Sequence, residues 1–168
     1  MTQTARLIKT LTEKGLTVAT AESLTGGMLA GELVSVPGAS AAFTGGIVSY
    51  ATPLKKTLLG VDGARLDEFG PVDGIVAQQM AEGARQACAV EGRWADLGIA
   101  TTGVAGPDPD AQTGQTAGTV YIGIATSAGA RSVLLALSGD RAAIRAATVA
   151  AAIDEALIEL QALALNAV

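Results

Sequence analysis

The segment 20–27 combines hydroxyl side chains with glycines at a point where a strand pattern gives way to a helix pattern. A β-branched run predicts a strand over 17–21, and a helix is predicted over 25–34. Ser23 and Thr25 are residue types that cap helix N-termini, and the two glycines that follow let backbone N–H groups approach a ligand closely. Such a corner favours an anion or a developing oxyanion beside a serine hydroxyl. The pattern fits a serine nucleophile, and it also fits a plain helix cap.

Histidine is absent from the 168 residues, and Cys88 is the single cysteine. A Ser-His-Asp triad, a Cys-His dyad and a histidine-bound zinc are therefore excluded. A metal could be held only by carboxylates and carbonyls, which suits magnesium or calcium. The base of any hydrolase built on this chain must be Lys, Tyr, Asp or Glu. We expect no metal and no cofactor.

Charge and hydrophobicity limit the possible partners and the location of the protein. The net charge is −5, and five aromatic residues cannot form a basic, stacking surface, so nucleic acid is not an expected partner. Hydrophobic residues make up 49% of the chain, yet no apolar run reaches the roughly 18 residues of a membrane span. The beginning of the chain lacks the features of a signal peptide. We expect a soluble, cytoplasmic protein without membrane contact and, because its surface must absorb an apolar composition, a homo-oligomer, most simply a dimer.

Hydrophobic periodicity predicts alternating helices and strands followed by a hairpin and a long helix. This order gives an α/β fold, a three-layer α/β/α sandwich whose mixed, mostly parallel sheet ends in an antiparallel hairpin, in one domain over 1–168. Cys88 lies on the apolar face of the predicted helix 73–89 and is expected in the core. The predicted strands are 17–21, 43–50, 97–102, 119–125 and 131–137, and the predicted helices are 3–14, 25–34, 53–59, 73–89 and 140–163.

The strand-to-helix junctions place further polar residues near Ser23. Tyr50 and Lys55 lie where the second predicted strand ends and the next helix begins, and the loop 103–117 follows the third predicted strand. Ligands of α/β sheets bind at the carboxyl ends of strands, so these junctions are expected to meet at one site.

Several separated stretches, in this order, resemble the CinA C-terminal domain family, the nicotinamide-nucleotide amidohydrolases. The resemblance runs from about residue 16 to residue 160. The matching stretches are Ala21-Glu22-Ser23-Leu24-Thr25-Gly26-Gly27, Val36 to Ser40 with Gly46 to Tyr50, Lys55 with Leu58 to Val61, Thr102 to Pro107 with Gly118 to Val120, and Gly139-Asp140-Arg141.

The resemblance implies hydrolysis of the carboxamide of nicotinamide mononucleotide to nicotinic acid mononucleotide and ammonia, a step of pyridine-nucleotide salvage. It implies that Ser23 is the nucleophile and that Tyr50 and Lys55 activate it. A desolvated lysine loses its proton more readily and can then take the proton of a serine hydroxyl. Tyr50 would relay a proton or stabilise the oxyanion. The implied substrate-binding residues are Thr25, Gly26, Gly27, Thr102, Gly103, Ala105, Gly106 and Arg141.

The phosphate of such a substrate needs a local positive site in a chain of net charge −5. Arg141 starts a predicted helix within a matching motif, and Arg145 lies one turn further on the same face. Backbone N–H groups near Gly26 or Gly103 are the alternative site for binding the phosphate. Two other functions stay open: a non-catalytic nucleotide-binding or regulatory module, and an amidase for another substrate.

Overall fold

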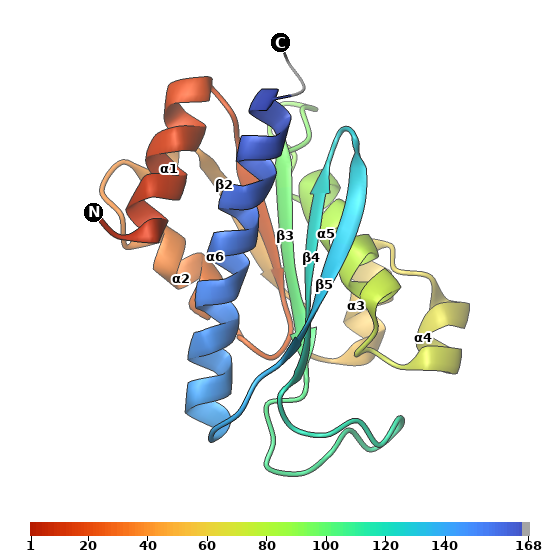
Figure 1. The fold of residues 1–168 in the computed structure, drawn as a ribbon. Coiled ribbons are helices and arrows are strands. Elements are labelled where there is room, and N and C mark those ends of the chain that lie inside the picture. Colours follow the sequence, from red (N-terminus) through yellow and green to blue (C-terminus); the bar gives the residue numbers. More distant parts are fainter. Residues whose placement is uncertain (166–168) are drawn as a thin grey trace.

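The computed structural model describes residues 1–165 and contains one five-stranded mixed sheet, in the order β2-β1-β3-β4-β5 (Figure 1). β1 runs parallel to its neighbours β2 and β3, whereas β4 runs antiparallel to β3 and β5. The predicted α/β fold with a mixed sheet that ends in an antiparallel hairpin is therefore confirmed. The last three residues of the predicted domain lie outside the described part. The strands are β1 Val18–Glu22, β2 Phe43–Val48, β3 Leu97–Gly103, β4 Thr119–Thr126 and β5 Gly129–Ala136.

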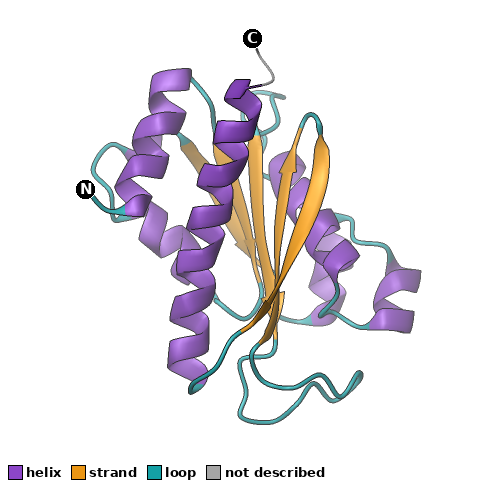
Figure 2. Cartoon of the chain, viewed as in Figure 1, coloured by secondary structure: helices purple, strands orange, loops and turns teal. Residues whose placement is uncertain are grey.

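Helices cover both faces of the sheet, as Figure 2 shows. α1, α2 and α6 pack on one face, where buried side chains such as Leu7, Leu29 and Ile144 meet Ile99 and Ile122 of the sheet. α3 and α5 cover the other face, with α4 beside them (Figure 1). The helices are α1 Gln3–Lys14, α2 Met28–Val34, α3 Thr52–Leu59, α4 Gly63–Phe69, α5 Gly74–Ala87 and α6 Arg141–Leu165, with a short 3-10 helix over Ala39–Ala41.

Two strand glycines allow α5 to lie directly on the sheet. A Cβ atom at Gly98 of β3 would overlap the carbonyl oxygen of Ala81, and one at Gly123 of β4 would overlap that of Ala77. Larger residues would push the helix away, because backbone atoms cannot yield as a flexible side chain can. These two contacts fix β3 and β4 against α5.

Two predicted helices have different ends in the structure. α2 begins at Met28 rather than residue 25, because Gly27 adopts a left-handed conformation with φ of 96° and the preceding residues form a turn. α5 ends at Ala87, so Cys88 caps the helix and is only half-buried, beside Gly45. Cys88 therefore packs against the core from its edge, rather than lying inside the core as predicted. Burial still raises the pKa of the Cys88 thiol, which disfavours a thiolate.

Other local predictions are confirmed. The Asp73 carboxylate accepts hydrogen bonds from the amides of Ile75 and Val76 at the start of α5. Asp140 likewise accepts one from the amide of Ala143 at the start of α6. Across the described residues, no helix has both the length and the apolarity that crossing a membrane requires.

Candidate active site

A cavity of about 220 Å³ opens at the carboxyl ends of β1 and β3, beside the N-termini of α3 and α6. This is the lower end of the sheet in Figure 1, where the loop between β3 and β4 hangs below the strands. The predicted site residues that line it are Ser23, Tyr50, Lys55, Thr102, Gly103, Ala105 and Arg141. The structure adds Leu24, Thr52, Pro71, Val72 and Asp110.

Lys55 and Ser23 form a buried pair in this cavity. The Lys55 Nζ donates a hydrogen bond to Ser23 Oγ at 3.0 Å and another to the carbonyl oxygen of Ser49 at 2.8 Å. Lys55 is 0% exposed and Ser23 9%. Burial lowers the pKa of Lys55 to about 8, because a charged amine loses its hydration there. Near neutral pH, a useful fraction of Lys55 is therefore a free amine within reach of a serine hydroxyl.

Strand pairing places the two members of this pair. The Ser23 amide donates to the carbonyl oxygen of Thr101 on β3, so Ser23 continues the β1–β3 ladder by one residue. The Ser49 amide donates to the carbonyl oxygen of Glu22, which continues the β1–β2 ladder in the same way. α3 then begins at Thr52, and its first turn carries Lys55 back over the end of β1.

Glu22 fixes the turn that follows Ser23. Its buried carboxylate, which is 1% exposed, accepts hydrogen bonds from the amides of Gly27, Leu29 and Ala30 at 2.8–3.0 Å. A carboxylate at this place satisfies the donors of the first helical turn and complements the helix dipole. The expected anion cradle at this helix N-terminus is thus occupied by the protein's own carboxylate.

The amides of Leu24 and Thr25 are the remaining donors of this turn. The Gly26 amide bonds to the carbonyl of Ser23, and the Met28 amide bonds to that of Thr25. Within the described residues, the amides of Leu24 and Thr25 have no acceptor. Leu24 directly follows the serine and lines the cavity, and the amide of the residue after the nucleophile is an oxyanion-hole donor in strand-turn-helix hydrolases.

Arg141 and Tyr50 meet at the cavity. Arg141 Nη1 donates to the carbonyl oxygen of Gly106 at 2.9 Å, and its Nη2 donates to the Tyr50 hydroxyl at 3.2 Å. Tyr50 is 60% exposed. Its hydroxyl therefore contacts Arg141, and the partner that contacts Ser23 is Lys55. Gly106 contributes a carbonyl to this contact and does not line the cavity.

Three other predicted residues support the site from behind. The Thr25 hydroxyl is buried and lies 2.7 Å from that of Thr101, with either oxygen as donor. The amides of Gly26 and Gly27 are used by Ser23 and Glu22 within the turn. Thr25, Gly26 and Gly27 do not line the cavity.

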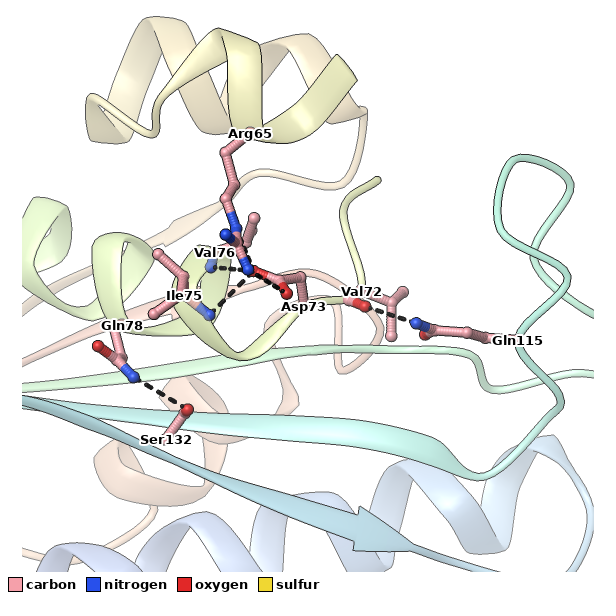
Figure 3. A network of polar contacts seen from close by, with 8 residues as sticks. All are labelled: Arg65, Val72, Asp73, Ile75, Val76, Gln78, Gln115 and Ser132. Carbon is pink, nitrogen blue, oxygen red and sulfur yellow. Dashed lines mark hydrogen bonds and ion pairs between the residues drawn. The ribbon is translucent and has the colours of Figure 1, made fainter. Parts of the chain in front are cut away.

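Pro71 and Val72 form another wall of the cavity, and side chains from three elements hold the segment 71–73. Thr102 Oγ1 at the end of β3 donates to the carbonyl oxygen of Pro71 at 2.6 Å. Figure 3 shows Gln115 reaching from the β3–β4 loop to the carbonyl of Val72, while Asp73 accepts from Arg65 and from the start of α5. This wall is therefore tied to the sheet, to α4 and to the long loop.

Comparison with known proteins identifies the family. Residues 1–160 match the model of the CinA C-terminal domain. A CinA-like protein of Frankia casuarinae is 48% identical over 144 residues, which is 86% of this chain and 32% of that protein. A CinA-like protein of Geobacter sulfurreducens is 44% identical over 153 residues, which is 91% of this chain and 35% of that protein. The chain thus spans about a third of the length of these curated relatives.

Solved structures agree with this match. The competence/damage inducible protein CihA of Agrobacterium tumefaciens has a TM-score of 0.85 and 35% identity, covering 95% of this chain and 93% of that one. A CinA superfamily protein of Klebsiella pneumoniae has a TM-score of 0.88 and 28% identity, covering 95% and 96%. The protein therefore belongs to the CinA C-terminal domain family.

Proposed function

We propose that this protein hydrolyses the carboxamide of nicotinamide mononucleotide, releasing nicotinic acid mononucleotide and ammonia. The observation that supports this most directly is the buried contact of 3.0 Å between Lys55 Nζ and Ser23 Oγ. A nucleophile with a base in hydrogen-bond reach is the geometry of covalent acyl transfer, and a lysine base suits a chain that has no histidine. The choice of substrate comes from the resemblance to nicotinamide-nucleotide amidohydrolases.

The acylation half of the proposed reaction uses the pair directly. The neutral amine of Lys55 takes the Ser23 proton as Oγ attacks the carboxamide carbon. Negative charge then develops on the carboxamide oxygen, and the free amide of Leu24 is the proposed backbone donor that stabilises it. The Lys55 ammonium returns its proton to the amide nitrogen, the C–N bond breaks, and ammonia leaves an ester on Ser23.

The hydrolytic half repeats these roles with water. Lys55 takes a proton from a water molecule that attacks the ester carbon, and the Ser23–carbon bond breaks with return of a proton to Ser23. The product carboxylate is released. Tyr50 and Arg141 act at the substrate's other end in this proposal: Arg141 binds the phosphate, and the Tyr50 hydroxyl orients Arg141. In our proposal, Thr102, Gly103 and Ala105 contact the nicotinamide ring.

The decisive assay measures ammonia released from nicotinamide mononucleotide, beside nicotinamide, nicotinamide riboside and simple amides. We expect the mononucleotide to be preferred. Hydrolysis of a different amide instead would overturn the substrate, and the absence of hydrolysis together with tight nucleotide binding would favour a regulatory module.

The same assay on Ser23→Ala tests the nucleophile. We expect ammonia release to fall by several orders of magnitude, since the equivalent change in a serine protease costs on the order of 10⁶ in rate. Circular dichroism and the thermal midpoint should stay at the values of the unchanged protein. Normal ammonia release from folded Ser23→Ala would exclude Ser23 as the nucleophile.

A further inference from the structure

Asp110 is the one carboxylate among the described residues that line the cavity. It lies in the loop between β3 and β4, which hangs below the sheet in Figure 1. The cations of the same lining are Lys55 and Arg141. Neither forms an ion pair with Asp110 in the described part of the chain. The cavity therefore holds positive and negative charges that do not neutralise one another by contact.

The loop fixes Asp110 through one oxygen of its carboxylate. Oδ1 accepts hydrogen bonds from the amide of Gln112 at 3.2 Å and from the amide and the hydroxyl of Thr113, both at 2.8 Å. The backbone is held as well, because the Asp110 amide donates to the carbonyl of Gln115 and the Asp110 carbonyl accepts from the amide of Gly114. Oδ2 has no partner among the described residues. One oxygen thus anchors the loop, and the other is available to a ligand.

A carboxylate in this cavity disfavours a ligand that brings only negative charge. A phosphate that is attracted by the guanidinium of Arg141 is also repelled by Asp110, since both charges act within one small cavity. A ligand that carries a positive charge as well gains an attraction that offsets this repulsion. Nicotinamide mononucleotide is such a zwitterion, because its glycosidic bond leaves the ring nitrogen as a pyridinium cation.

The order of groups in this substrate places the charge of the ring inside the cavity. In the proposed reaction the carboxamide reaches Ser23 Oγ, and Arg141 binds the phosphate. The pyridinium lies between these two ends, because the ring carries the carboxamide on one side and the ribose phosphate on the other. Lys55 acts as a neutral amine in that reaction, so Asp110 is the lining residue whose charge complements the ring.

We propose that Asp110 is a specificity-determining residue that selects a mononucleotide with a cationic pyridinium ring over one with an uncharged ring. This inference rests on the proposed function and deepens it, because it assigns recognition of the ring charge to the loop between β3 and β4. Arg141 cannot supply this selection, since the oxidised and the reduced mononucleotide carry the same phosphate.

The test compares the binding of two ligands that differ in the ring alone. Nicotinamide mononucleotide and its 1,4-dihydro form share the carboxamide, the ribose and the phosphate, but only the first has a charged ring. Dissociation constants are measured by calorimetry in Ser23→Ala, which binds ligands without hydrolysing them in the proposed mechanism. Asp110→Asn removes the charge and keeps a carbonyl oxygen for the loop amides.

Two control variants in the same background separate the charge from the loop. Asp108 lies in this loop, is exposed and does not line the cavity, so Asp108→Asn makes the same change of net charge away from the ligand. Asp110→Glu keeps the charge and alters the contacts with the loop amides. The ratio of the two dissociation constants is the readout, because damage to the loop would weaken both ligands together.

We expect Asp110→Asn to weaken binding of nicotinamide mononucleotide about tenfold and to change binding of the dihydro form by less than about twofold. Asp108→Asn and Asp110→Glu should keep the ratio of the two constants within about threefold of the parent Ser23→Ala protein.

An unchanged ratio in Asp110→Asn, or an equal shift of the ratio in Asp108→Asn, would overturn the inference and leave the proposed hydrolysis standing. A protein with Ser23 intact that binds the mononucleotide but releases no ammonia would overturn the proposed hydrolysis, while the binding ratio would still decide the role of Asp110. Failure of Ser23→Ala to bind either ligand would overturn both the substrate and this inference.

Discussion

In the proposed mechanism, Lys55 couples the activity of the site to pH through a single proton. Only the free amine can accept the proton of Ser23, and burial lowers the pKa of Lys55 to about 8. The active fraction therefore grows as pH rises toward this value and is constant above it. We predict that kcat/KM increases about tenfold per pH unit below the pKa and levels off above it.

The neighbouring lysine supplies a matched control for this pH profile. Lys56 is exposed, whereas Lys55 is fully buried. Lys56→Met should keep both the kcat/KM and the pH midpoint of the unchanged protein. Lys55→Arg, which stays protonated, should remove activity at every pH. A profile that is flat from pH 6 to 9, or one that moves in Lys56→Met, would exclude Lys55 as the base.

At the residue scale, the sequence predicted most of the residues that line the site but not all of the contacts between them. The strand-to-helix corner and the family motif predicted Ser23 and Lys55 as site residues. The structure places Lys55 Nζ 3.0 Å from Ser23 Oγ. The contact between Arg145 and Leu24 could not be predicted, because the two residues lie 121 positions apart in the chain. The contact between Tyr50 and Arg141 spans 91 positions and was equally hidden.

At the element scale, α2 depends on a carboxylate that precedes it by six residues. Glu22 is the last residue of β1 and satisfies amides of Gly27, Leu29 and Ala30. In Glu22→Gln, the amide NH₂ group would face amide donors, and the charge that complements the helix dipole would be lost. We predict that the free energy of unfolding falls by about 2 kcal/mol, measured by urea denaturation.

The matched control for Glu22→Gln is a glutamate in a surface ion pair. Glu13 pairs with Lys9 along α1, where both side chains are more than half exposed. Glu13→Gln should change the free energy of unfolding by less than about 0.5 kcal/mol. Equal effects of the two changes would show that Glu22 is not an important cap.

Element ends were the least predictable part of the fold. Periodicity gives the apolar face of α5 but not its end, so Cys88 was assigned to the core although the helix stops at Ala87. The start of α2 depends on the left-handed turn at Gly27 and on the cap from Glu22, a contact between two elements. α4 is only seven residues long and gives too few turns for a periodic signal.

At the scale of the whole molecule, exposed apolar residues favour self-association. Val48 on the edge strand β2 is 45% exposed, and Leu134 on the edge strand β5 is 57% exposed. Edge strands with apolar side chains are common sites of contact between chains. We predict a homodimer, seen by light scattering as twice the mass of one chain at micromolar concentration. A mass of one chain under these conditions would contradict this prediction.

The overall charge of the molecule determines what the phosphate of the proposed mononucleotide substrate needs in order to bind. A molecule of net charge −5 repels an anionic ligand, so binding requires a local cation whose charge is not already neutralised. Arg141 meets this requirement, since its contacts at the cavity are with neutral oxygens of Gly106 and Tyr50. A phosphate would replace or join them as a bidentate acceptor.

Arg141→Ala should therefore raise KM for nicotinamide mononucleotide while sparing any activity toward nicotinamide riboside, which has no phosphate. The expected loss is that of a charged hydrogen bond, roughly 1.5–3 kcal/mol, or about 10- to 150-fold in KM. Tyr50→Phe should have a smaller effect of the same kind, because it removes one anchor of the guanidinium and leaves its charge. Equal losses on the two substrates, or none on either, would place the phosphate elsewhere, with the backbone amides near Gly103 as the remaining cradle.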